Sequence, residues 1–63
     1  MKTFTIIFWL HGWHQDEERE FQAISDAVDY CKKIKEQRRD VTGFDIYEER
    51  GFEQVLVFED KIK

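Results

Sequence analysis

The sequence feature that most constrains the fold is a segment near the N-terminus that is apolar on two sides. Residues 3–10 are rich in β-branched and aromatic side chains, which is typical of a β-strand. Successive side chains of a strand point to opposite faces, so Phe4 and Phe8 share one face. Ile7 and Trp9 share the other face. Because both faces are apolar, we predict a central strand of a sheet.

A helix is predicted over residues 26 to about 38. Ala27, Cys31 and Ile34 recur at helical spacing and form one apolar stripe that can pack on a sheet. Serine is a favoured N-cap residue, because its hydroxyl can accept a hydrogen bond from a backbone N–H of the first turn. We therefore expect Ser25 to cap the helix and Cys31 to be a small buried packing residue.

Residues 18–24 allow two interpretations. Read with a period of two, Arg19 and Phe21 share one side, which predicts the second strand of a hairpin. Read with the helical period, Phe21 joins the apolar stripe, which predicts one long helix that begins near position 16. The cap at Ser25 favours the hairpin, with a loop over residues 11–17.

Two further strands are predicted after the helix, over residues 44–48 and 52–59, with a turn at 49–51 between them. Residues 60–63 are expected to form a frayed tail. Glycine adopts positive φ without steric cost, so each glycine is predicted to lie in a turn. The glycines are Gly12, Gly43 and Gly51.

The predicted elements fit one small domain over residues 1–63. Their order is strand–strand–helix–strand–strand (ββαββ), or strand–helix–strand–strand (βαββ) if the long helix forms instead. Either order predicts an α+β fold, a two-layer sandwich with a mainly antiparallel sheet of three or four strands and one helix on one face. A chain this short buries only about 60% of its unfolded surface, so a partner chain would stabilise a marginal core.

The sheet face that the helix cannot cover is the first candidate binding surface. Strands with apolar side chains on both faces leave apolar groups uncovered there. The side chains expected on this face are Ile7, Trp9, Tyr47, Leu56 and Phe58. Trp13, at a loop tip, is a further candidate because tryptophan is enriched at binding hot spots. The alternatives for the uncovered face are a plain hydrated surface, a symmetric homodimer, or a different protein partner or ligand.

Charged clusters form the second group of candidates. A basic cluster is predicted at the helix end: Lys32, Lys33, Lys35, Arg38 and Arg39. It complements the helix dipole and could also contact phosphates, although the net charge of −4 disfavours general nucleic-acid binding. An acidic cluster precedes the helix: Asp16, Glu17, Glu18 and Glu20. It is interpreted as solvated charge, with a divalent cation or a basic partner as the alternative.

No arrangement in the sequence predicts catalysis. His11 and His14 have acidic neighbours, but their spacing is too loose for a typical metal site, and structural zinc sites usually include thiolates. Cys31 lies on the apolar stripe, and the cap role accounts for Ser25, so neither is predicted to be a nucleophile. We expect no enzyme activity, no metal site and no cofactor.

We expect a non-enzymatic interaction protein that forms a homodimer and acts as a small regulator or inhibitor. The alternative is a nucleic-acid accessory module that uses the basic cluster and exposed aromatic side chains. In its shortness, acidity and lack of proline, the chain is similar in style to small proteins encoded by phages and other mobile elements. Its single cysteine fits a reducing, cytoplasmic location. Its apolar run over residues 4–10 is far shorter than the roughly 20 residues of a membrane span.

Overall fold

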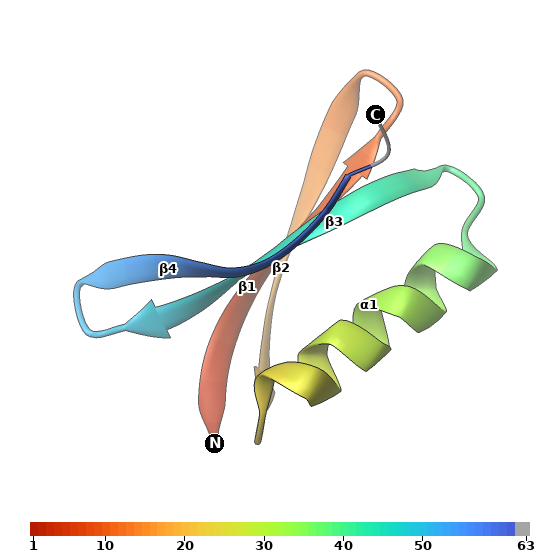
Figure 1. The fold of residues 1–63 in the computed structure, drawn as a ribbon. Helices are drawn as coiled ribbons and strands as arrows, with labels where there is room; N and C mark the ends of the chain where they lie inside the picture. Colours follow the sequence, from red (N-terminus) through yellow and green to blue (C-terminus); the bar gives the residue numbers. More distant parts are fainter. Residues whose placement is uncertain (62–63) are drawn as a thin grey trace.

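The computed structural model describes residues 1–61 and consists of a four-stranded antiparallel sheet with one helix on one face (Figure 1). The elements are β1 (Lys2–Leu10), β2 (Trp13–Phe21), α1 (Ile24–Gln37), β3 (Val41–Arg50) and β4 (Glu53–Lys61). The strand order in the sheet is β2-β1-β3-β4. The predicted α+β fold and its ββαββ order are therefore confirmed. Within residues 1–61, no helix has the length and apolar character that a membrane span requires.

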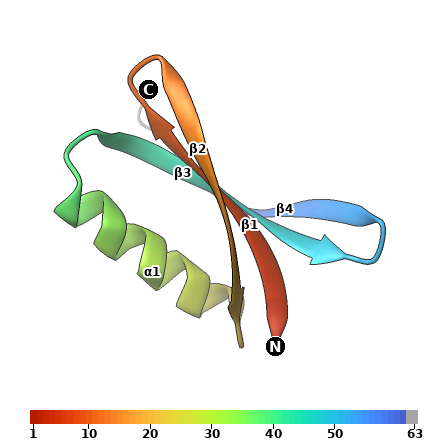
Figure 2. The ribbon, with the colours of Figure 1, turned by 180° about the vertical axis from the view of Figure 1, so that it is seen from behind.

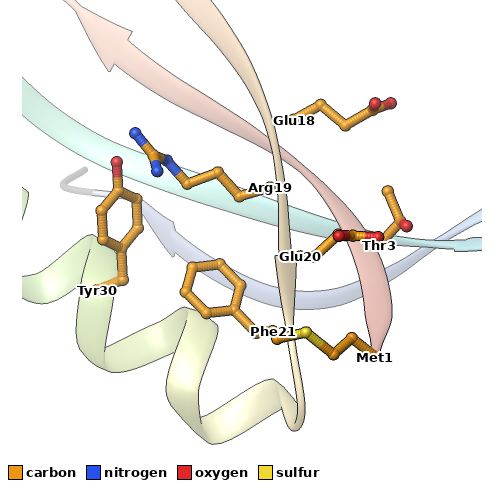
Figure 3. A pocket seen from close by; sticks show the side chains of 7 residues that line it. All are labelled: Met1, Thr3, Glu18, Arg19, Glu20, Phe21 and Tyr30. Carbon is orange, nitrogen blue, oxygen red and sulfur yellow. The ribbon is translucent and has the colours of Figure 1, made fainter.

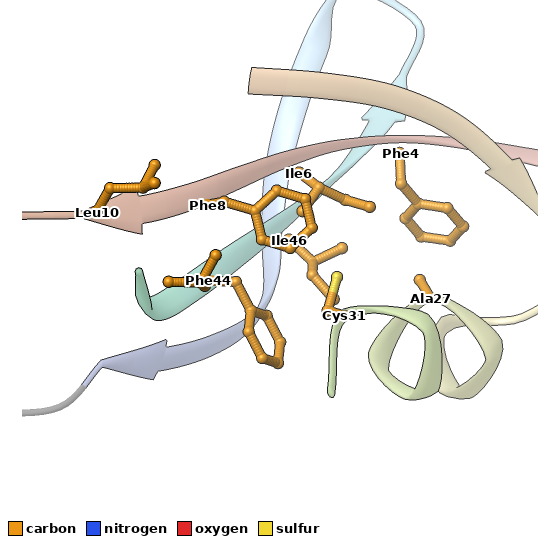
Figure 4. Close-up of a cluster of buried hydrophobic side chains, with 9 residues drawn as sticks. Phe4, Ile6, Phe8, Leu10, Ala27, Cys31, Phe44 and Ile46 are labelled. Atoms are coloured by element: carbon orange, nitrogen blue, oxygen red, sulfur yellow. The ribbon is translucent and has the colours of Figure 1, made fainter. Parts of the chain in front are cut away.

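The strand β1 lies inside the sheet, as its two apolar faces predict. It pairs with β2 on one side and with β3 on the other, both antiparallel. Its alternate residues Phe4, Ile6 and Phe8 are almost fully buried beneath α1. Figure 4 shows these side chains meeting Ala27 and Cys31 of the helix. This alternation fixes which residues of the neighbouring strands face the helix and which face away.

The first hairpin is tighter than predicted. Leu10 pairs directly with Trp13, so only His11 and Gly12 form the turn. Gly12 has a φ of 82°, a conformation that favours glycine and closes a two-residue turn. The predicted loop over residues 11–17 is wrong, because most of it belongs to β2. The alternative of one long helix is also wrong.

The helix begins before the predicted cap. Its N-cap is Ala23, which makes no side-chain capping hydrogen bond, and Ser25 lies inside the first turn. The N–H groups of Asp26 and Ala27 donate to the Ala23 carbonyl instead, at 3.2 and 3.4 Å. Ile24 packs against the core, so burial of its side chain favours a helix that already includes it. The predicted capping role of Ser25 is wrong.

The turn assigned to Gly43 is also wrong. Gly43 is buried within β3, where it pairs with Trp9. A glycine inside a strand is typical of a site where neighbouring groups approach the backbone closely. The second hairpin turns at Gly51, whose φ of 62° agrees with the prediction for that glycine.

A bulge in β4 decides the orientation of its apolar residues. Ile46 pairs with Phe58, but the next residue of β3, Tyr47, pairs with Leu56. Val57 is the extra residue, and a one-residue shift of register moves the following side chains to the opposite face. Leu56 therefore points away from α1, and Phe58 points toward it.

The core includes Phe58, one of the side chains that were predicted to face outward. Phe58 packs against the core and stacks on Phe44, with ring centroids 5.6 Å apart. The prediction that Phe58 lies on the uncovered face is wrong, because strict alternation does not continue through the bulge. Cys31 is a buried free thiol, and burial raises its pKa to about 12. The predicted packing role of Cys31 is confirmed.

The predicted frayed tail begins within a strand. Asp60 lies in β4, and its carboxylate accepts a hydrogen bond from the Lys35 ammonium at 3.0 Å. Residues 62–63, the end of that predicted tail, lie outside the described residues.

Candidate functional site

The sheet surface that points away from α1 is the main candidate site, and we call it the outer face. Views from opposite sides show that α1 covers only the other surface of the sheet (Figures 1 and 2). The outer face holds the β1 residues between the buried positions, together with their register partners. Directly paired residues of antiparallel strands share a face, so this assignment follows from the register.

The apolar part of the outer face, here called the apolar patch, consists of Ile7, Trp9, Tyr47 and Leu56. Ile7, Trp9 and Tyr47 are partly buried, and only Leu56 is exposed, with 45% of its surface accessible. They come from β1, β3 and β4, and the pairing of Tyr47 with Leu56 brings two of them into direct cross-strand contact range. The structure thus places these predicted residues together and removes only Phe58 from the set.

Hydrogen bonds hold the centre of the patch in place. The indole N–H of Trp9 donates to Oδ2 of Asp45 at 2.9 Å, and Asp45 is only 2% exposed. The Thr42 hydroxyl donates to the Trp9 carbonyl at 3.1 Å, next to a register shift between β1 and β3. Burying a carboxylate without hydrogen-bond donors costs free energy. The hydrogen bond to Asp45 therefore stabilises this orientation of the indole. The ring is thereby preorganised for contact.

Carboxylates surround the patch. They are Asp16, Glu18, Glu20, Asp45, Glu49 and Glu59, and one lysine position, Lys61, pairs with Gly43 at the end of β4. Among the described side chains of the outer face, His14 is the only basic one, and it is hydrogen-bonded to Asp16 through Nδ1 at 2.8 Å. Its ring lies 5.4 Å from the Trp9 ring. The outer face therefore combines apolar side chains with an excess of carboxylates, and one of these, Asp45, lies opposite Ile7 within the patch.

The acidic cluster of the sequence is divided between two faces. Asp16, Glu18 and Glu20 lie on the outer face, whereas Glu17 points toward the helix and accepts a hydrogen bond from the Tyr30 hydroxyl at 2.5 Å. The Arg19 guanidinium also bonds this carboxylate. Burial alone would raise the pKa of Glu17, but these two donors hold it below its ordinary value.

A hollow of about 510 Å³ lies along the free edge of β2, near the start of α1 (Figure 3). Arg19 and Tyr30 lie on its helix side, and the Arg19 guanidinium is stacked 4.8 Å above the Tyr30 ring. Glu18 and Glu20 line its other side. The hollow is a wide, open groove with ion-paired walls, and it shows no convergence of groups on one reacting atom.

The predicted basic cluster lies on the opposite side of the molecule from the apolar patch. Lys35 pairs with Asp60, and Arg38 pairs with Asp40 at 2.9 Å and with Gln15 at 3.3 Å. The remaining members are exposed: Lys32, Lys33 and Arg39. The structure therefore does not bring the basic cluster together with Trp9 and Tyr47 on one surface.

Two exposed aromatic residues lie at the hairpin tips. Trp13 is 59% exposed and pairs with Leu10, so it lies on the helix side of the sheet and outside the apolar patch. Phe52 is fully exposed in the turn of the second hairpin and was missed from the sequence. An aromatic residue directly after the turn glycine Gly51 is the signal that could have revealed it.

The candidate metal ligands and the candidate nucleophile do not come together in one site. Within residues 1–61, no group of three or more histidine, cysteine or acidic side chains is placed to hold a metal ion. His11 lies in the first turn, His14 bonds Asp16, and Cys31 is enclosed in the core.

No protein-family model, no curated protein and no solved structure matches this chain. Any proposal for its function therefore starts from the surfaces described above.

Proposed function

We propose that this chain is a protein-binding module that contacts a partner protein through its outer face. The observation that carries the proposal is the apolar patch, which the helix leaves uncovered and which hydrogen bonds hold in place. Exposed patches of aromatic and aliphatic groups with a polar rim are typical of protein contact sites. A small binding module of this kind acts as a regulator or inhibitor of the protein that it contacts.

The charge of the outer face favours a different protein over a second copy as the partner. A symmetric dimer brings the same surface of both subunits together, so it would oppose carboxylates to carboxylates. The outer face is also small for a stable interface with any globular partner, whether a second copy or a different protein. Four strands about 4.8 Å apart and about 30 Å long outline roughly 500–600 Å², less than the roughly 800 Å² per partner of a stable interface. A nucleic-acid module has less support, because the basic cluster and the patch lie on opposite sides.

Site-specific photo-crosslinking tests the proposal. A benzoylphenylalanine residue at Leu56 of the outer face is compared with one at Lys33, which is exposed on the helix. In cells of the native host, Leu56 should give discrete adducts with another protein, and Lys33 should not. Adducts from Lys33 alone would refute the location. An adduct of twice the chain mass from Leu56 would instead establish self-association.

A further inference from the structure

We infer that the free edge of β2 binds an extended segment of a partner protein as a fifth, antiparallel strand with lysine or arginine at alternate positions. This inference goes beyond the proposed function, because it concerns main-chain groups at an edge of the sheet and not the side chains of the apolar patch. Three features support it: the exposed edge, the row of carboxylates beside it, and the hollow at its end.

The strand β2 presents a long and regular edge. Among the described strands it pairs with β1 alone, over nine residue pairs without a shift of register. All its residues except Glu17 and Phe21 are exposed. The strand at the other edge, β4, carries the bulge at Val57. A regular edge strand offers a row of unpaired backbone N–H and C=O groups, and a bulge interrupts such a row, so β2 is better suited to strand addition.

The turn of the first hairpin decides which backbone groups of β2 point to the free edge. Leu10 and Trp13 flank a two-residue turn, and such a closing pair exchanges hydrogen bonds between its backbone N–H and C=O groups. From there, the residues of β2 alternate between bonding to β1 and pointing away from it. The outward groups therefore belong to the even positions: His14, Asp16, Glu18 and Glu20.

The side chains of these same four residues border the edge on the outer face. Directly paired residues of antiparallel strands share a face, so an added strand sets each residue that bonds to β2 beside this row. Three members of the row are carboxylates, and the fourth, His14, is bonded to Asp16. Opposite charges at directly paired positions stabilise the pairing, which favours basic residues there. Lys61 lies in β4, at the opposite edge of the sheet.

The same row opposes pairing of β2 with a second copy of itself. A two-fold axis at the edge pairs even positions with even positions, because only those residues carry outward groups. Centred on Glu17, the axis sets Asp16 opposite Glu18; centred one residue to either side, it sets Asp16 or Glu18 opposite its own copy. These registers have the longest overlap, and each brings like charges together. A partner segment of opposite charge is therefore the favoured occupant.

The hollow at the end of β2 leaves room for the other side chains of the added strand. Figure 3 shows Arg19 and Phe21 leaving β2 toward the helix, and Glu18 and Glu20 leaving it on the opposite side. On the helix side, the rings of Phe21 and Tyr30 lie 5.5 Å apart between centroids. Residues between the basic ones point to this side, where contact with the rings removes apolar surface from water. The partner segment is thus expected to alternate basic and apolar residues.

Titration with N-methylated peptides tests the inference on the native chain. The probe is a hexapeptide of alternating lysine and valine with blocked ends, and amide NMR spectra follow binding at about 0.15 M salt. In the antiparallel addition, the lysine N–H groups bond β2 and the valine N–H groups point away. Methylation of the lysine N–H groups should weaken binding about tenfold or more, because it removes those hydrogen bonds. The control, methylation of the valine N–H groups, should change the affinity by about twofold or less.

The amide signals of the protein locate the added strand. Amides of Asp16, Glu18 and Glu20 should shift and exchange with solvent more slowly in the presence of the peptide, because they gain hydrogen bonds. Amides of Glu17 and Arg19 already bond to β1 and should exchange at an unchanged rate. A peptide of alternating glutamate and valine should not bind, since its charge repeats that of β2.

A matched pair of variants separates the main chain from the charge. Glu18→Pro removes an outward N–H together with a carboxylate, and Glu18→Gln removes the carboxylate alone. Proline is tolerated on an edge strand where the N–H faces solvent, so both variants should fold. Glu18→Pro should bind the lysine–valine peptide about fivefold more weakly than Glu18→Gln.

Each remaining result overturns the inference. Equal effects of the two methylation patterns would show a contact that does not use one edge of the peptide. Loss on valine methylation alone would overturn the antiparallel orientation, and equal affinity for the lysine and glutamate peptides would overturn the requirement for basic residues. Absence of binding would overturn strand addition altogether, while crosslinks at Leu56 would still support the proposed function.

Discussion

Replacing Phe58 with alanine should lower the free energy of unfolding far more than replacing Leu56, two residues away. The bulge at Val57 turns Phe58 into the core and leaves Leu56 on the outer face. Strict alternation would give these two side chains the same orientation. The comparison therefore tests the register of β4 directly.

The expected loss of unfolding free energy depends on how far the Phe58 and Leu56 side chains are buried. A fully buried phenylalanine costs about 3–5 kcal/mol when truncated to alanine. Phe58 is partly buried and stacks on Phe44 with an interplanar angle of 14°, so we expect about 2–3 kcal/mol, part of it from the ring pair. Leu56 keeps 45% of its surface exposed, and its loss should cost about 1 kcal/mol or less.

Urea denaturation followed by circular dichroism measures both values. A domain of this size has a total stability of about 3–9 kcal/mol, so Phe58→Ala should remove a large share of it and lower Tm by roughly 10–20 °C. Leu56→Ala should change Tm by only a few degrees, because its expected loss of unfolding free energy is smaller. An equal or larger loss for Leu56→Ala would refute the bulged register.

Three further predictions concern the core thiol, the helix-side ion pair and assembly. Cys31 should react with dithionitrobenzoate at pH 8 roughly a thousandfold more slowly in the native protein than in urea, because burial raises its pKa from 9.0 to about 12 and lowers the thiolate fraction. The pKa of Glu17 is depressed in the folded state, so its stabilising effect is present above pH 4.5 and is lost as the pH falls through the lower, folded-state value. Urea titrations should show this loss in the parent protein and a weaker one in Glu17→Gln; equal pH profiles would contradict the assignment. Sedimentation at high micromolar concentration should show a monomer, since like charges oppose a symmetric contact of the outer face, and a dimer that Leu56→Glu disrupts would contradict this expectation.

Local patterns in the sequence were enough to predict several elements correctly. The two apolar faces of residues 3–10 identified the central strand, because the period of two and the number of faces to be buried are properties of the segment itself. The apolar stripe through Ala27 and Cys31 likewise identified the helix and its buried side. Gly51 marked the second turn, since its positive φ is a local requirement.

Other features depended on neighbouring strands and could not be seen locally. Residues 14–17 are polar, and they form a strand because β1 offers them a complete row of backbone partners. Ile24 extends the helix toward Ala23 because its side chain finds a place in the core, which outweighs the local preference for Ser25 as a cap. Gly43 lies in a strand, where it pairs with Trp9 across the sheet, and this pairing is not visible in the local sequence.

The candidate site shows the same division. The sequence alone determined that an apolar strand with two faces must leave one of them outside the helix, and it identified Ile7, Trp9, Tyr47 and Leu56 as the side chains there. Only the tertiary structure decided that Phe58 turns inward and that Glu17 and Glu18 face opposite ways. The physical reason is that the period of a strand is local, whereas its register and its bulges are set by hydrogen bonds to strands that are distant in the chain.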